Sequence, residues 1–131
     1  MPTRKRPARR PRAGRASGDL PETFKEFTAR HPGLADAHRA IAAGVEGAGP
    51  LDARTRSLVK IGICAGRGLD SALRSHVRRA REAGVSPAEI EQAVLLAMNT
   101  IGFPETVAAW KRAREELARA APGRSARAAK R

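Results

Sequence analysis

The sequence predicts an all-α fold, a compact bundle of about six helices, and three observations support this. Apolar residues recur at three- and four-residue spacing between residues 20 and 117. Breaks rich in Gly and Pro separate these periodic segments, and no segment has the pattern of a strand. The chain has three Phe, one Trp and no Tyr, so its core must consist of Leu, Ile, Val and Ala. Such interiors favour closely packed helices.

The basic residues of the chain are unevenly distributed. The formal net charge is +13, but residues 1–16 carry seven Lys or Arg and residues 121–131 carry four, with no acidic residue in either stretch. The segment between them is nearly neutral. Both ends lack the large apolar residues that would offset the entropy of ordering. We therefore predict basic disordered tails at 1–18 and 121–131, and one helical domain at 19–120, since 131 residues leave room for only one.

Basic tails attract polyanions through counterion release, so weak, non-specific and salt-sensitive contact with nucleic acid is one expectation. Purely solubilising extensions are the alternative. No apolar segment follows the Arg-rich start, and the longest stretch without charge, residues 92–104, is too short to span a bilayer. We expect a soluble, cytoplasmic protein without membrane contact. The single cysteine, Cys64, excludes an internal disulfide and fits a reducing compartment.

The first two predicted helices are short. In the first, Leu20, Phe24 and Phe27 share one face, and the sequence at residues 31–33 (His-Pro-Gly) ends it. The second has apolar residues at helical spacing from Leu34 to Val45 and ends in a loop at residues 44–50. His38 lies beside this stripe, and we interpret it as a packed or partly exposed side chain.

The third and fourth predicted helices carry the polar residues of interest. Asp52 is a plausible N-cap of the third, which ends at residues 66–68. Its expected inward face consists of Leu58, Val59, Gly62 and Ala65. The fourth runs over residues 70–83 with Gly84 just beyond it, and His76 lies within its apolar stripe of Leu69, Leu73, Val77 and Ala80. On another face are Arg74, Arg78 and Arg81, a pattern typical of a solvated surface or of one that meets acidic groups.

The fifth predicted helix has the clearest start in the chain, because Ser86-Pro87-Ala88-Glu89 has the sequence of a capping box. Leu95, Leu96 and Met98 spread its hydrophobicity around most of the circumference, so a neighbouring subunit is expected to supply part of its cover. A break at residues 102–104 starts the sixth helix, whose apolar residues are Val107, Trp110, Ala113 and Leu117.

Several short stretches, in order, resemble the carboxymuconolactone decarboxylase-like family of the alkylhydroperoxidase-D-like superfamily. They are Leu51–Val59, Ser75–Ala80, Ala83–Ser86, Glu89-Ile90 and Gly102–Pro104. The similarity covers roughly residues 20–118. It implies a homo-oligomer, a trimer or hexamer, with pockets at or near the subunit contacts.

Redox-active members of the superfamily carry a Cys-x-x-Cys pair before a histidine that matches His76, and a glutamate one helix earlier. The matching positions here are Leu69, Ala72 and Ser57, and none fits the pattern. Peroxidase chemistry needs an attacking thiolate and a resolving thiol, which one cysteine cannot provide. The resemblance therefore favours a decarboxylase-like lyase over an alkylhydroperoxidase or peroxiredoxin-type antioxidant enzyme.

Decarboxylation requires groups that hold carboxylates, stabilise negative charge and return a proton. The resemblance makes His76 the candidate general acid, with Ser57 as a possible hydrogen-bond partner in the catalytic site. Arg54, Arg56 and Arg74 are near enough in sequence to be candidates for binding the substrate carboxylate. No cofactor and no metal site is predicted.

The leading hypothesis is a cofactor-free oligomeric enzyme that carries out proton-transfer or decarboxylation chemistry on a small carboxylated or lactone-like molecule. The alternative is a non-catalytic helical oligomer that binds a ligand or partner, with His76 in a structural role.

Overall fold

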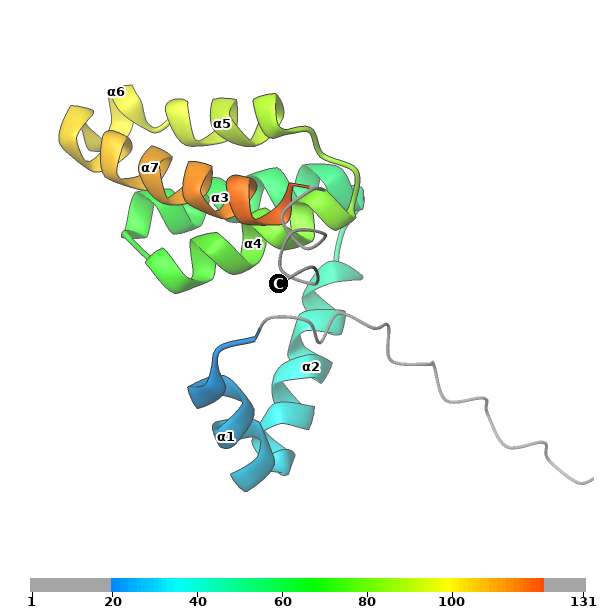
Figure 1. The fold of residues 1–131 in the computed structure, drawn as a ribbon. Coiled ribbons are helices and arrows are strands. Elements are labelled where there is room, and N and C mark those ends of the chain that lie inside the picture. The colour runs from blue at the N-terminus through cyan, green and yellow to red at the C-terminus, as the bar shows by residue number, and fades with distance from the viewer. Residues whose placement is uncertain (1–19, 122–131) are drawn as a thin grey trace, which may run out of the picture. The chain divides into compact units, whose positions relative to one another are not determined.

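A computed structural model of the chain describes residues 20–121. Over this range the protein is all-helical, which confirms the predicted fold class (Figure 1). The helices are α1 (Glu22–Arg30), α2 (Pro32–Glu46), α3 (Ala53–Arg67), α4 (Asp70–Glu82), α5 (Pro87–Leu95), α6 (Met98–Ile101) and α7 (Phe103–Ala120). The tails predicted to be disordered lie outside the described residues, except for Ala121. None of the described helices has the length and hydrophobicity needed to cross a bilayer.

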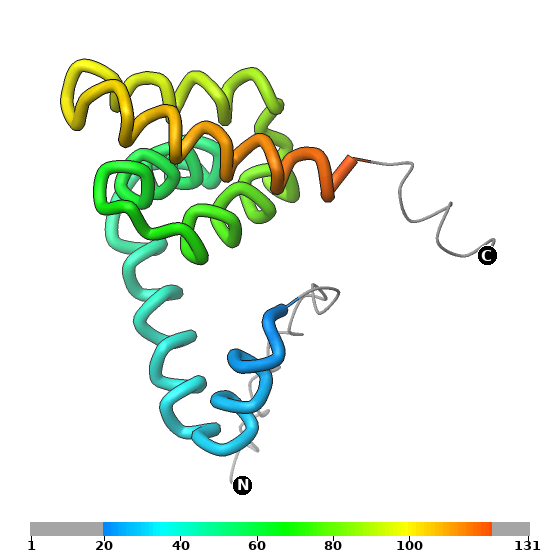
Figure 2. Tube along the Cα trace, turned by 60° about the vertical axis from the view of Figure 1, so that its left-hand side comes forward, coloured from blue at the N-terminus to red at the C-terminus, as the bar shows by residue number. Residues whose placement is uncertain are grey.

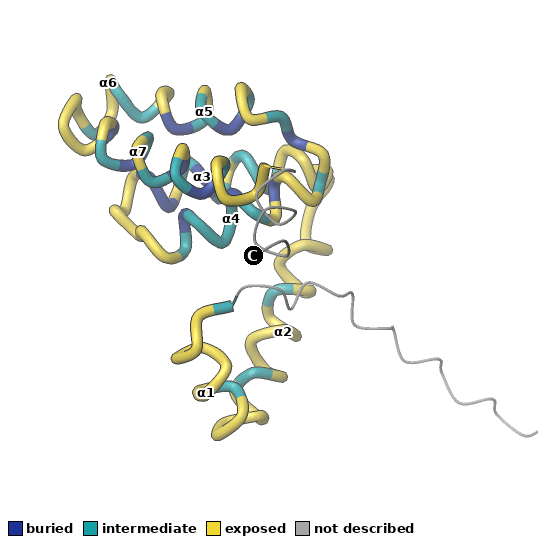
Figure 3. Tube along the Cα trace, viewed as in Figure 1, coloured by how far each residue is buried: buried dark blue, intermediate teal, exposed yellow. Residues whose placement is uncertain are grey.

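The chain divides into two units, Met1–Val45 and Glu46–Arg131. The described part of the first unit consists of α1 and most of α2, and neither helix contains a buried residue (Figure 3). Phe27 and His31 pack ring to ring, with centroids 5.0 Å apart. His38 is exposed. A single domain over residues 19–120 stays a prediction.

The second unit is a bundle in which four helices surround one core. Helix α3 packs against α4 and α5, and α7 packs against the same two helices, so the four form a closed ring (Figure 2). The short helix α6 packs on α7. The buried apolar residues lie on the inner faces of these helices, apart from Val85 in the loop between α4 and α5: Ile61, Cys64, Ala65, Leu73, Val77, Ala80, Val85, Ile90, Val94, Ala109 and Ala113.

Local sequence explains where the helices of the bundle begin and end. The Asp52 carboxylate accepts a hydrogen bond of 2.8 Å from the Thr55 N–H at the start of α3. Gly68 ends α3 with a φ of 66°, a conformation in which a side chain would be strained. At the start of α5, Ser86 and Glu89 form the predicted capping box.

Two details differ from the sequence predictions. The buried face of α3 consists of Ile61, Cys64 and Ala65, whereas Val59 of the expected inward face is exposed. Val59 is exposed because it lines an open groove between α3 and the segment formed by α5 and α6, and not the core. The fifth predicted helix is also interrupted, because a turn at Leu96 and Ala97 separates α5 from α6.

Candidate functional site

His76 lies on α4, which packs against both α3 and α7. Its side chain is half-buried, whereas His31 and His38 are exposed. Burial, followed by the positive charges of Arg79 and Lys60, lowers the pKa of His76 below its usual range. The imidazole is therefore mainly neutral near pH 7, and its protonated form is a stronger acid than a histidine in water.

Ser57, the other proposed catalytic residue, is on α3. It lies three residues before Lys60 and so on a similar side of the helix. Its hydroxyl donates a hydrogen bond of 2.8 Å to the Ala53 carbonyl of its own helix. The hydrogen bonds of the described residues include none between Ser57 and His76. The structure thus places Ser57 on the side of α3 that carries Lys60, with its hydroxyl engaged within the helix.

Arg74 points to a different edge of the bundle from His76. Residues two positions apart on an α-helix diverge by about 200°. Accordingly, the Arg74 guanidinium donates a hydrogen bond of 2.7 Å to Glu115 on α7. Arg78 donates one of 2.9 Å to Glu116, also on α7. The arginine face of α4 therefore meets acidic residues of the chain itself, and Arg74 is not beside His76.

Arg54 and Arg56 are both engaged near the start of α3. Arg54 donates to both carboxylate oxygens of Glu89, at 2.8 and 3.0 Å, and to the Gly84 carbonyl. Arg56 donates to the Leu51 carbonyl just before its helix. Arg54 thus ties α3 to the start of α5, and the structure gathers none of the three arginines around His76.

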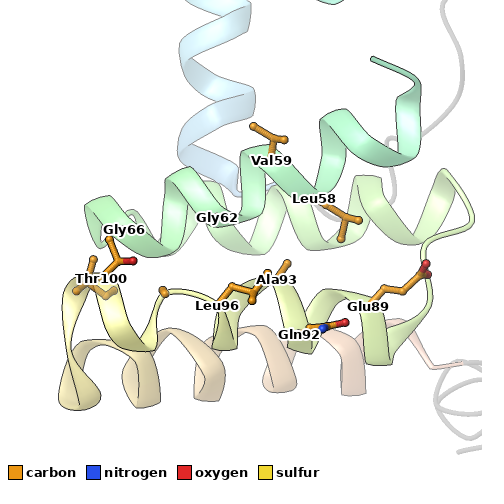
Figure 4. Close-up of a pocket in the computed structure, with 11 residues that line it drawn as sticks. Leu58, Val59, Gly62, Gly66, Glu89, Gln92, Ala93, Leu96 and Thr100 are labelled. Carbon is orange, nitrogen blue, oxygen red and sulfur yellow. The ribbon is translucent and has the colours of Figure 1, made fainter. Parts of the chain in front are cut away.

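A groove that the sequence did not reveal lies between α3 and the α5–α6 segment. Its volume is about 570 Å³, and Figure 4 shows Leu58 pointing from α3 toward α5, with Glu89 and Thr100 at opposite ends. Its lining is mostly apolar: Leu58, Val59, Gly62, Gly66, Glu89, Gln92, Ala93, Leu96, Ala97, Thr100 and Ile101. His76 is not among these residues.

The sequence feature that could have indicated this groove is the spacing of small residues on the two facing segments. Gly62 and Gly66 are four residues apart on α3, and Ala93 and Ala97 are four apart on the facing segment. Small side chains at this spacing put little bulk into the space between two helices. The spacing alone is compatible with direct helix contact, so only the coordinates show that the space is open.

A second cavity of about 360 Å³ lies where α3 ends and α4 and α7 begin, and Cys64 is one of its lining residues. The Cys64 side chain is only 4% exposed. Burial raises the pKa of its thiol, which disfavours the reactive thiolate. This agrees with the sequence argument against peroxidase chemistry. His76 does not line this cavity either.

Within residues 20–121, no three His, Cys, Asp or Glu side chains gather as a metal site would require. Of the three histidines, all within the described residues, His76 is the one that is half-buried, and its protonated form is disfavoured by burial and by the charges of Arg79 and Lys60.

Comparison with known proteins assigns the chain to a family. Residues 32–115 match the model of the carboxymuconolactone decarboxylase family, a segment that includes all of α2 to α6 and most of α7. No curated protein sequence gives a significant match. The family match covers well over half of the chain and confirms the resemblance stated from the sequence motifs. The chain therefore belongs to the carboxymuconolactone decarboxylase family.

Proposed function

We propose that this protein is an oligomeric, cofactor-free enzyme that decarboxylates, or moves a proton on, a small carboxylated or lactone-like molecule, with His76 as general acid. The observation that carries the proposal is the placement of His76. It is a half-buried imidazole on α4 in a chain of this family, and burial and the charges of Arg79 and Lys60 lower its pKa.

The chemistry needs proton transfer and charge stabilisation. The bond between the carboxylate carbon and its neighbour breaks, carbon dioxide leaves, and the electron pair passes into an adjacent carbonyl to form an enolate. The imidazolium of His76 then donates its proton to the carbon that lost the carboxylate, and a proton from solvent restores it. The lowered pKa of His76 makes its protonated form an effective donor.

The test is turnover after a change at His76. Small carboxylic acids and lactones are screened by thermal shift on the native protein, and carbon dioxide release is measured for every hit. We expect His76→Gln to fold normally and to lose about 100-fold or more of the turnover. The matched control, His38→Gln, changes an exposed histidine and leaves turnover intact. If His76→Gln retains most of the turnover, His76 is not the general acid.

The oligomer is supported by the exposed apolar groove between α3 and α5–α6. Two of its lining residues, Val59 and Leu96, are 47% and 68% exposed. Apolar surface of this kind is commonly covered by another subunit. We propose that a second copy covers it in a trimer or hexamer. Light scattering coupled to size-exclusion chromatography tests this: Leu96→Glu is expected to yield smaller species, whereas Ala118→Glu, on exposed α7 surface, is not. A monomeric native protein would overturn it.

One observation favours the alternative of a non-catalytic binding protein, because His76 lines neither of the two cavities described above. This alternative expects that ligands identified by thermal shift bind equally well to the native protein and to His76→Gln, and that none of them is turned over.

A further inference from the structure

The cavity of about 360 Å³ that Cys64 helps to line lies at one end of the bundle, where α3 ends and α4 and α7 begin (Figure 1). Helices α3, α4, α6 and α7 all contribute residues to its wall. Small-molecule sites usually measure about 300–1,000 Å³, so this volume suits a ligand of the size of a single amino acid. His76 does not line the cavity, so the proposed catalytic chemistry makes no use of it.

The buried part of the cavity wall is apolar. It consists of Cys64, Ala65, Leu73 and Ala109, each of which is at most 6% exposed. The Cys64 thiol adds no charge, because burial raises its pKa. The inner wall therefore offers contact to an apolar group of a ligand and no partner for a charged one.

The less buried part of the wall carries charges of both signs. Its charged residues are two arginines and two acids, so their formal charges cancel: Arg67, Arg112, Asp70 and Glu105. Arg112 on α7 is paired with Asp70 on α4 at 2.7 Å. Within residues 20–121, neither Arg67 nor Glu105 belongs to an ion pair, and both are exposed. One cation and one anion without a partner in the fold thus line the same cavity.

These two unpaired charges select the class of ligand. A molecule with a single charge would pair with one of the two side chains and leave the other without a partner. An α-amino acid carries a carboxylate and an ammonium on the same carbon atom and can pair with both. Its carboxylate accepts hydrogen bonds from the Arg67 guanidinium, and its ammonium donates to the Glu105 carboxylate.

We propose that this cavity is a binding site for an α-amino acid with an apolar side chain. Arg67 and Glu105 hold its two charged groups, and its side chain contacts the wall formed by Cys64, Leu73 and Ala109. The site is separate from His76, so the proposal goes beyond the proposed function and does not depend on it.

The test compares three probes that have the same branched carbon chain and differ in their charged groups. L-leucine has both groups, 4-methylpentanoate lacks the ammonium, and 3-methylbutylamine lacks the carboxylate. Binding to the full-length protein is measured by calorimetry at pH 7 and constant ionic strength. We expect L-leucine to bind in the millimolar range or more tightly, and each of the other two probes to bind at least about tenfold more weakly.

Two charge variants assign the two ends of the ligand. Arg67→Gln is expected to weaken L-leucine binding about tenfold and to remove its advantage over 3-methylbutylamine, because the carboxylate then has no partner. Glu105→Gln is expected to weaken L-leucine binding similarly and to remove its advantage over 4-methylpentanoate. The matched controls, Lys111→Gln and Glu82→Gln, remove one exposed charge of each sign outside the cavity and leave binding unchanged.

A change in shape tests the cavity without altering its charges. Ala108 is a half-buried lining residue on α7, and Ala108→Leu is expected to fill the space and abolish L-leucine binding. Ala118→Leu adds the same bulk on an exposed part of α7 and leaves binding intact. Circular dichroism confirms that each variant folds.

Three results would overturn the inference. The first is no binding of L-leucine at millimolar concentrations, and the second is equal binding of the three probes. The third is L-leucine binding that is unchanged in both Arg67→Gln and Glu105→Gln. His76→Gln is expected to bind L-leucine as the native protein does, and a loss of binding in this variant would also contradict the assignment to this cavity.

Discussion

The change Glu116→Gln tests how the bundle is closed between α4 and α7. The Glu116 side chain is only 3% exposed and lies between three arginines. Arg78 donates a hydrogen bond of 2.9 Å to one of its oxygens. Its other oxygen lies 3.9 Å from Arg74, and neither that oxygen nor the Arg74 Nη1 has a hydrogen-bond partner among the described residues. The buried charge of Glu116 thus compensates the arginines of α4.

The expected loss of stability on Glu116→Gln depends on how deeply its arginine partners are buried. Removing one member of a fully buried ion pair costs about 3–5 kcal/mol. Arg74 and Arg78 keep about a quarter of their side-chain surface exposed and can be partly rehydrated. We therefore expect Glu116→Gln to cost about 2–3 kcal/mol, less than the fully buried value. For a domain of this size, that corresponds to a fall of roughly 10–20 °C in the unfolding temperature.

Calorimetric and urea unfolding at pH 7 measure the effect, and Glu115→Gln is the matched control. Glu115 is the preceding residue and also bonds Arg74, but its side chain is 42% exposed. Water can replace most of the stabilisation that the Glu115 charge contributes. We therefore expect Glu115→Gln to lower the unfolding temperature much less than Glu116→Gln. Equal unfolding temperatures for the two variants would refute the argument that burial, rather than pairing alone, sets the cost.

Three further predictions concern other parts of the chain. Ser86→Ala removes the capping box of α5 and should lower the unfolding free energy by about 1 kcal/mol in urea titrations; an unchanged midpoint would contradict the capping argument. The pKa of His76 is lower in the folded state than in the unfolded state, so the unfolded state binds more protons as pH falls below about 6.5. Stability should therefore decline in that range, and less so in His76→Gln; equal pH profiles would argue against a depressed pKa. The basic ends should cause a salt-sensitive shift of nucleic acid in gels that a chain of residues 17–120 does not, and a shift that persists in the shorter chain would place the binding in the helical region.

The helices could be predicted from the sequence because their signals are local. Apolar spacing identifies segments, and caps such as Asp52 and Ser86 are set by neighbours three residues away. The turn between α5 and α6 could not be predicted, because Leu96 and Ala97 are compatible with a continuous helix. That interruption depends on how the segment packs against its neighbours.

The candidate site was only partly predictable. His76 was identified through its position in a family motif. Arg74 was selected for its closeness in sequence, although the helical angle between the two residues places them on different edges of the bundle. Lys60 was overlooked because its relation to His76 depends on how α3 packs against α4. Contacts within a helix can be predicted from the spacing of residues in the sequence. Contacts between helices can be predicted only when the packing of the helices is known.

The most direct test of the account is the rate of carbon dioxide release by the native protein and by His76→Gln, measured on the same acid in the same buffer. A loss of about two orders of magnitude, with fold and subunit assembly intact, is the result expected if the imidazole returns the proton. Equal rates within a few-fold would contradict that role and leave His76 as a structural residue of the bundle.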